Sequence, residues 1–180
     1  MKKLFLLFAL TAAALCGQPA TLDLGSHGQL TLYFPEGWKV TSTNMAGQAT
    51  LTATPAGDAN ATCTLQVSFP EQDRFDTKSR LKTRVEADGY PIAENSVEGK
   101  AIAHEFSLTS GFGFYCSFTD AELRGKPATK GEFKVMSLGK IHLAPDVLID
   151  VQIMADAFRD KAYQELLGAI EGMEFKAGSG

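Results

Sequence analysis

Residues 133–155 decide the fold class and read FKVMSLGKIHL (133–143), APD (144–146) and VLIDVQIMA (147–155). Phe133, Val135, Ile141 and Leu143 share the odd positions of the first run with the small residues Ser137 and Gly139, which fits the two-residue period of a β-strand with one buried face. Pro145 and Asp146 between the two runs are typical of a tight turn. The stretch therefore predicts two successive antiparallel strands.

Further strands are predicted on the N-terminal side of this pair. Residues 62–69 are the clearest of them, because Cys63, Leu65, Val67 and Phe69 alternate with polar residues and Pro70 ends the run. The other predicted strands are 30–34, 38–43, 49–54, 95–98, 101–109 and 112–119. Short turns separate most of them, so an antiparallel meander is expected.

Two amphipathic helices complete the prediction. The first begins at Asp76 or Thr77, which are good N-cap residues, and ends at Asp88-Gly89. The second runs from Phe158 to Met173 and carries one apolar stripe. We therefore predict an α+β fold: a single antiparallel sheet of about six to eight strands with two amphipathic helices packed on it.

The first twenty residues have the pattern of a secretory signal peptide. Met1-Lys2-Lys3 is positively charged, Leu4 to Leu15 is an uncharged apolar run, and small or turn-forming residues follow up to Ala20. The run is too short for a spanning helix of about 20 residues. We predict a signal peptide over 1–20, a single domain over 21–176, and a disordered tail or cloning scar over 177–180.

Two routes of maturation follow from this pattern. Cleavage near Cys16 or Ala20 would release a periplasmic or secreted domain. Lipidation of Cys16 would instead give a membrane-anchored lipoprotein, although Leu15 is larger than the residue that normally precedes a lipidated cysteine.

The charge of the chain limits its partners. Removing Lys2 and Lys3 leaves 15 basic against 21 acidic residues, so the processed chain has a net charge of −6. Nucleic acids and anionic membranes require a basic face, so neither is a predicted partner. No later apolar run is long enough to span a membrane.

Two cysteines remain after processing, Cys63 and Cys116. Each shares strand parity with apolar neighbours, so both thiols are predicted to point into the core. An even pair in an oxidising compartment favours a Cys63–Cys116 disulfide. The alternative is two buried free thiols that pack as small hydrophobic groups.

The order of these features resembles the PsbP-type fold, which is also seen in the DcrB family of bacterial envelope proteins. The resemblance covers roughly Leu30 to Phe175 and rests on a Pro-x-Gly-Trp turn (35–38), a strand ended by Pro70, a Val-x-Gly-x-Ala element (97–101) and a closing amphipathic helix. It implies a non-catalytic accessory, chaperone-like or immunity-type role. It transfers no functional residue to this chain.

No catalytic or metal-binding motif is present in the sequence. His27, His104 and His142 have no partners at the spacing of zinc ligands, and there is no Gly-x-Ser-x-Gly element. A Cys116–His104 pair across a hairpin is conceivable, but apolar surroundings raise the pKa of a thiol and lower its reactivity. We therefore predict no enzyme activity, no cofactor and no metal.

The leading prediction is an exported domain that binds another protein in the cell envelope. The loop from Ser117 to Gly131 is long for a connection between adjacent strands, and such loops often carry recognition. Its candidate interface residues are Asp120, Glu122, Arg124, Lys126 and Lys130. The alternative is a small-ligand or lipid-binding periplasmic domain, with a cavity beneath a helix where Ser137 and Gly139 leave space.

Overall fold

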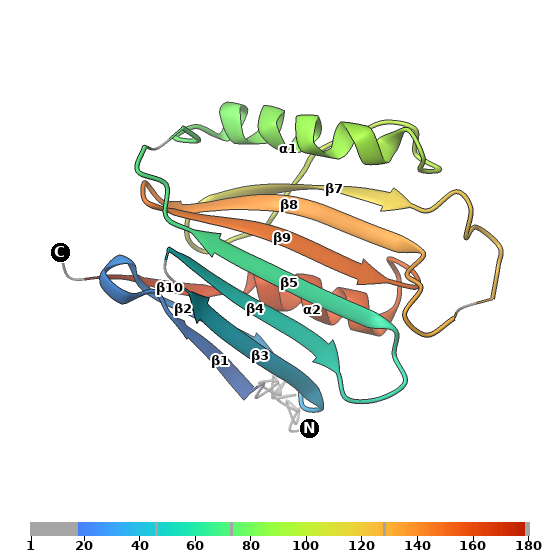
Figure 1. Ribbon diagram of the computed structural model, residues 1–180, viewed down its shortest axis with the longest axis horizontal. Helices are drawn as coiled ribbons and strands as arrows, with labels where there is room; N and C mark the ends of the chain where they lie inside the picture. The colour runs from blue at the N-terminus through green and yellow to red at the C-terminus, as the bar shows by residue number, and fades with distance from the viewer. Residues whose placement is uncertain (1–17, 46, 73, 128, 179–180) are drawn as a thin grey trace, which may run out of the picture.

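The computed structural model describes residues 18–178 except 46, 73 and 128 (Figure 1). The helices in this part of the chain are α1 (Lys78–Ala93) and α2 (Lys161–Glu171), with one 3-10 turn, η1 (Gly25–His27). The strands are β1 (Gln18–Asp23), β2 (Gly28–Phe34), β3 (Trp38–Met45), β4 (Gln48–Pro55), β5 (Ala61–Ser68), β6 (His104–Glu105), β7 (Phe112–Thr119), β8 (Val135–Ala144), β9 (Val147–Ala155) and β10 (Glu174–Ala177).

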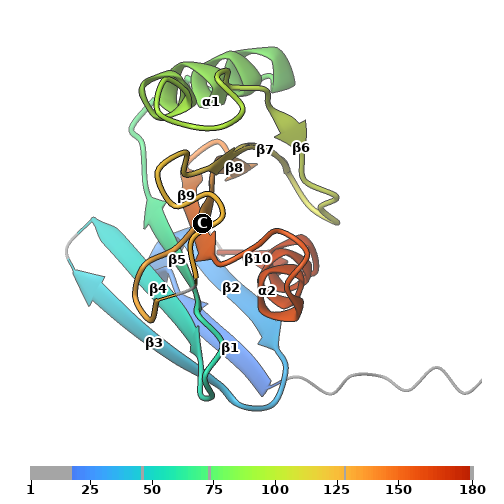
Figure 2. The same ribbon diagram turned by 90° about the vertical axis from the view of Figure 1, so that its right-hand side faces the viewer.

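Seven strands form one antiparallel sheet in the order β3-β4-β5-β9-β8-β7-β6. The pair predicted from residues 133–155 is the β8–β9 hairpin near the centre of this sheet, with a register shift between His142 and Ala144. Successive side chains of a strand point to opposite faces, so each strand contributes to two surfaces. Both faces of the central strands carry buried residues, because helices lie on opposite sides of the sheet (Figure 2).

The prediction of a single sheet is wrong, because β1, β2 and β10 form a second sheet of three strands with β2 in the middle. This small sheet and α2 cover one face of the large sheet. Leu30, Leu32 and Phe34 of β2 pack with Leu166 and Ile170 of α2 in the main core.

Helix α1 covers part of the other face. Thr77 caps its N-terminus by accepting a hydrogen bond from the backbone N–H of Arg80 (3.3 Å). The predicted end at Gly89 is wrong, since the helix continues to Ala93 and includes Pro91. Gly89 is instead a packing position: an alanine Cβ there would lie 2.8 Å from Cζ of Phe118. The glycine lets α1 approach β7 closely.

The structure also overturns the predicted disulfide. Cys63 and Cys116 are both buried and both free. Cys63 lies on β5 and Cys116 on β7, with β9 and β8 between them. Strands in a sheet are about 4.8 Å apart, so the two cysteines are separated by roughly 14 Å, well beyond the reach of a disulfide. They also belong to different clusters, Cys63 beneath α2 and the small sheet and Cys116 beneath α1.

The predicted signal peptide reaches into the first described strand. Its prediction falls mainly on residues 1–17, which lie outside the described residues. Residues 18–20 belong to β1, so the folded domain begins before the predicted boundary at residue 21.

None of the helices in the described segments is long and apolar enough to cross a membrane. The predicted hairpin over 95–109 is reduced to the two-residue strand β6 and one bridge between Ser96 and Asp120.

Candidate functional site

The face of the large sheet that carries α1 is only partly covered. Helix α1 packs on β7 and β8, while β3 and β4 extend away from beneath it (Figure 2). The uncovered part of this face carries polar side chains on β5 and β9, among them the half-exposed Thr64 and Gln152 and the exposed Gln66. Two hollows lie where this open face meets the side of α1.

The first hollow is mainly apolar and lies near the C-terminal end of α1. Its volume is about 430 Å³. The floor is formed by Met136 and Met154, which are directly opposed on β8 and β9. Its other lining residues are Pro91, Ile92, Asn95, Ser96, Phe118, Thr119, Asp120, Phe133, Lys134 and Val135. Methionine side chains adapt to different shapes, so this floor suits an inserted apolar side chain.

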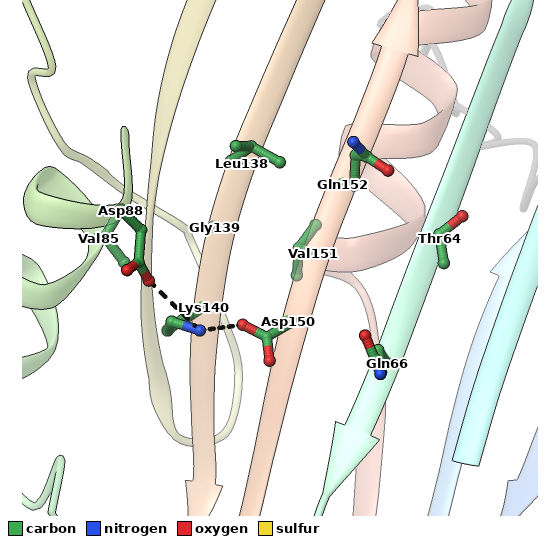
Figure 3. Close-up of a pocket in the computed structure, with 10 residues that line it drawn as sticks. All are labelled: Thr64, Gln66, Val85, Asp88, Leu138, Gly139, Lys140, Asp150, Val151 and Gln152. Atoms are coloured by element: carbon green, nitrogen blue, oxygen red, sulfur yellow. Dashed lines mark hydrogen bonds and ion pairs between the residues drawn. The ribbon is translucent and has the colours of Figure 1, made fainter. Parts of the chain in front are cut away.

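The second hollow carries more charged and amide side chains than the first and lies beside the middle of α1, with a volume of about 310 Å³ (Figure 3). Lys140 projects into it between two carboxylates, at 3.5 Å from Asp88 of α1 and in a direct ion pair with Asp150 of β9. The Lys140 side chain is only 15% exposed, whereas that of Asp150 is 42% exposed. Gln152 lies one pair further along the strands, opposite Leu138, and its amide donates a hydrogen bond to the sulfur of Met136 (3.5 Å) (Figure 3).

The two hollows follow the same pair of strands. The register of β8 and β9 places Met136 opposite Met154 and Lys140 opposite Asp150, with one further pair between them on the same face. The hollows therefore follow one another along the side of α1, and we call the two together the α1 groove. An apolar hollow next to hydroxyl, amide and charged groups has the composition of a site for a protein segment with one apolar anchor.

The predicted interface loop between β7 and β8 lies at the apolar end of this groove. The Asp120 carboxylate accepts hydrogen bonds from the backbone N–H groups of Glu122 (2.8 Å) and Leu123 (3.1 Å), so Asp120 shapes the loop. Glu122, Arg124, Lys126 and Lys130 are exposed. Of the five predicted residues, Asp120 alone lines the groove.

The far part of the loop is held by Asn60, which the sequence analysis did not single out. The Asn60 amide donates to the carbonyls of Glu132 (2.9 Å) and Thr129 (3.3 Å) and to the carboxylate of Asp156 (2.8 Å). Its side-chain oxygen accepts from the N–H of Gly131 (3.0 Å). The loop is therefore attached to the sheet at both of its ends.

The space predicted beneath a helix at Ser137 and Gly139 is filled. The Ser137 hydroxyl is hydrogen-bonded to those of Ser117 and Tyr163, each at 2.7 Å. A Cβ on Gly139 would lie 2.9 Å from Cβ of Tyr115 and 2.6 Å from a backbone oxygen. The small residues serve close packing, which removes the basis given for a lipid or small-ligand cavity.

The structure separates the residues that were weighed for catalysis. His104 is paired with Tyr115, so their side chains share one face of the sheet, while Cys116 points to the other face under α1. Burial, with a smaller effect of the nearby Glu86 carboxylate, raises the pKa of the Cys116 thiol to about 11. His27 stacks on Phe69 with 4.1 Å between ring centroids. Among the described residues, no group of three or more His, Cys, Asp or Glu side chains could hold a metal ion.

Comparison with known proteins gives few matches. No family model and no curated protein matches the chain. The chain is similar to the crystal structure of the Saccharomyces cerevisiae Ran-binding protein Mog1p, with a TM-score of 0.48 and 14% identity over 88% of this chain and 95% of that one. A mutant of Mog1 matches with a TM-score of 0.48 and 15% identity over 87% and 95%. Such values do not transfer a partner from Mog1 to this chain.

These comparisons bear on two predictions from the sequence. Both of these similar structures are Mog1 proteins, not members of the PsbP or DcrB families, and no family model supports those families. The order of loosely defined strands, turns and helices was too general to distinguish one family from another. The predicted periplasmic, secreted or lipoprotein localisation rested on the signal-peptide pattern of residues 1–20, most of which lie outside the described residues, and none of the matches supports it.

Proposed function

We propose that this chain is a non-catalytic protein-binding domain and that the α1 groove receives a segment of its partner. The observation that carries the proposal is the half-buried pair Met136 and Met154, which opens to the surface beside a helix that leaves the rest of the sheet face free. Residues of this type are enriched in protein interfaces and depleted from surfaces that contact only water. An apolar anchor in such a hollow would supply most of the affinity.

The charges in the groove indicate what the partner segment carries. The lining residues include three carboxylates, Asp88, Asp120 and Asp150, and two ammonium groups, Lys134 and Lys140. Asp150 is the more exposed partner of Lys140, so it can accept an additional hydrogen bond from an incoming donor. We infer a neutral or weakly basic segment with one apolar side chain at the methionine end.

The predicted loop extends this surface. Arg124 and Lys126 are exposed in the segment between Asp120 and the part that Asn60 holds. Loops that are fixed at both ends present their side chains with little loss of entropy on binding. In this proposal, these two basic residues contact the rim of the partner and influence the association rate more than the affinity.

Site-specific photo-crosslinking tests the proposal. A photoreactive residue at position 154 should give discrete adducts with a partner, whereas one at Lys161 of α2, whose side chain is 90% exposed on the other side of the sheet, should not. Met136→Gln keeps the length of the side chain and removes its apolar end, so it should weaken binding by about 30-fold, the loss typical of an anchor residue. Equal adducts from both positions, or adducts unaffected by M136Q, would refute the groove as the binding site.

A further inference from the structure

Strand β3 differs from the other sheet edges in the described structure. Edge strands expose unpaired backbone groups, and proteins usually protect them by shortness, proline or charge. β6 has two residues, β10 has four and includes two charged residues, and β1 contains Pro19. β3 has eight residues, no proline, one charge (Lys39) and a continuous register with β4. Thr41 to Met45 are all exposed.

The register determines which backbone groups of β3 are free. Ala56 donates its N–H to the carbonyl of Gly37 (2.6 Å), so these two residues form a hydrogen-bonded pair at the end of the β3–β4 ladder. Hydrogen-bonded pairs alternate along an antiparallel ladder, so Thr41 and Thr43 also bond to β4. The N–H and C=O groups of Val40 and Ser42 therefore point away from β4, toward the outer edge.

A hollow of about 430 Å³ lies along this outer edge, between β3 and β1. Its lining includes the half-buried Trp38 and Val40 above the buried Phe34 and Leu51, and Lys39 is the one charged residue among the residues described as lining it. At one end, the side chain of Asn44 donates to the backbone carbonyl of Asp23 on β1 (3.0 Å). This hydrogen bond joins the two strands at that end. Farther along, β1 and β3 run next to each other with the hollow between them (Figure 1).

We propose that β3 is a site of β-strand addition, where an extended, uncharged segment of a partner protein pairs with the outer edge. Backbone hydrogen bonds to Val40 and Ser42 would supply affinity, and every second side chain of the segment would enter the hollow beside Trp38 and Val40. The near absence of charge in the lining selects against acidic or basic segments. This site is separate from the α1 groove and does not depend on it.

A displayed library of linear ten-residue peptides, selected on the whole chain, tests the proposal. Peptides that alternate apolar and polar residues should be enriched and should bind with measurable anisotropy changes. Ser42→Pro removes the outward N–H, and proline is tolerated at edge positions whose N–H faces solvent. We expect S42P to weaken peptide binding at least tenfold and S42A, which keeps the N–H, to leave it within twofold. Unfolding by urea checks that both variants remain folded.

Residue-resolved hydrogen exchange provides a second readout. On peptide binding, exchange should slow at the amides of Val40 and Ser42, while those of Thr41 and Thr43 should change little because they already bond to β4. Failure to enrich peptides, equal binding to S42P, or slowed exchange confined to the α1 groove would overturn the proposal. Concentration-dependent dimers that S42P returns to monomers would also overturn it, in favour of pairing between two copies of β3.

Discussion

The same substitution, glycine to alanine, is expected to have opposite effects in the two helices. At Gly168 of α2, nothing lies within 4 Å of an added Cβ. Alanine is favoured over glycine in a helix by up to about 1 kcal/mol, because glycine loses more backbone entropy on folding. We expect Gly168→Ala to raise the free energy of unfolding by about 0.5–1 kcal/mol.

At Gly89 of α1, the same gain is opposed by overpacking. An added Cβ would lie 2.8 Å from Cζ of Phe118, 3.1 Å from Cβ of Ala101 and 3.4 Å from Cβ of Cys116. Carbon atoms prefer separations of about 3.5–4.0 Å, so α1 must move away from β7 or the buried Phe118 ring must shift. Overpacking of a core costs about 1–3 kcal/mol, which leaves a net loss of about 1 kcal/mol for Gly89→Ala.

Equilibrium unfolding in urea measures both effects. A difference of about 2 kcal/mol between the two variants corresponds to roughly 1 M in the urea midpoint for a domain of this size. Phe118→Leu removes the atom nearest to the new Cβ, so Gly89→Ala should be less harmful in that background. Stabilisation by Gly89→Ala equal to that by Gly168→Ala would show that α1 does not pack closely against β7 at this position.

Three further predictions concern the thiols and the loop. In denaturant, thiol labelling should find both Cys63 and Cys116 reactive without prior reduction; protection that a reductant removes would restore the disulfide. Burial raises the pKa of Cys63 from 9.0 to about 12, so its contribution to stability is complete below pH 9 and is lost as the pH rises toward 12, by up to about 1.4 kcal/mol per pH unit. Urea midpoints between pH 8 and 10.5 should therefore fall less steeply in Cys63→Ala than in the wild type, and parallel slopes would contradict this. Asn60→Ala should release the loop and accelerate tryptic cleavage after Arg124, while the neighbouring Ala59→Ser should not change the cleavage rate.

The sequence predicted local elements better than it predicted their arrangement. The alternation of side-chain types was sufficient to predict strands within 62–69 and 133–155, because one face of each of these strands is buried whichever strands lie beside it. The same parity rule placed Cys63 and Cys116 in a core but could not show that the sheet has a core on each face. β10 was not predicted, because a strand of four residues is too short to show an alternating pattern of side chains. Its partner β2 also lies far away in the sequence.

The candidate site was less accessible to sequence reasoning. The long loop was recognisable from its length and charge, but the α1 groove arises from the position of α1 on the sheet. Met136 and Met154 meet only through the register of β8 and β9, and neither residue type marks a site in isolation. Asn60 could have been noticed as a residue suited to binding backbone groups, although its partners are 69 to 96 positions away.

The position of β2 between β1 and β10 has a consequence for the order of folding. β1 is followed almost at once by β2, so the two can pair early in synthesis, whereas Gly28 pairs with Ala177. Contacts so distant in sequence close large loops and form slowly. The second edge of β2 therefore stays open until residues 174–177 have left the ribosome, and a nascent chain halted before them would expose Leu30 and Leu32 on a strand with half of its hydrogen bonds unmade.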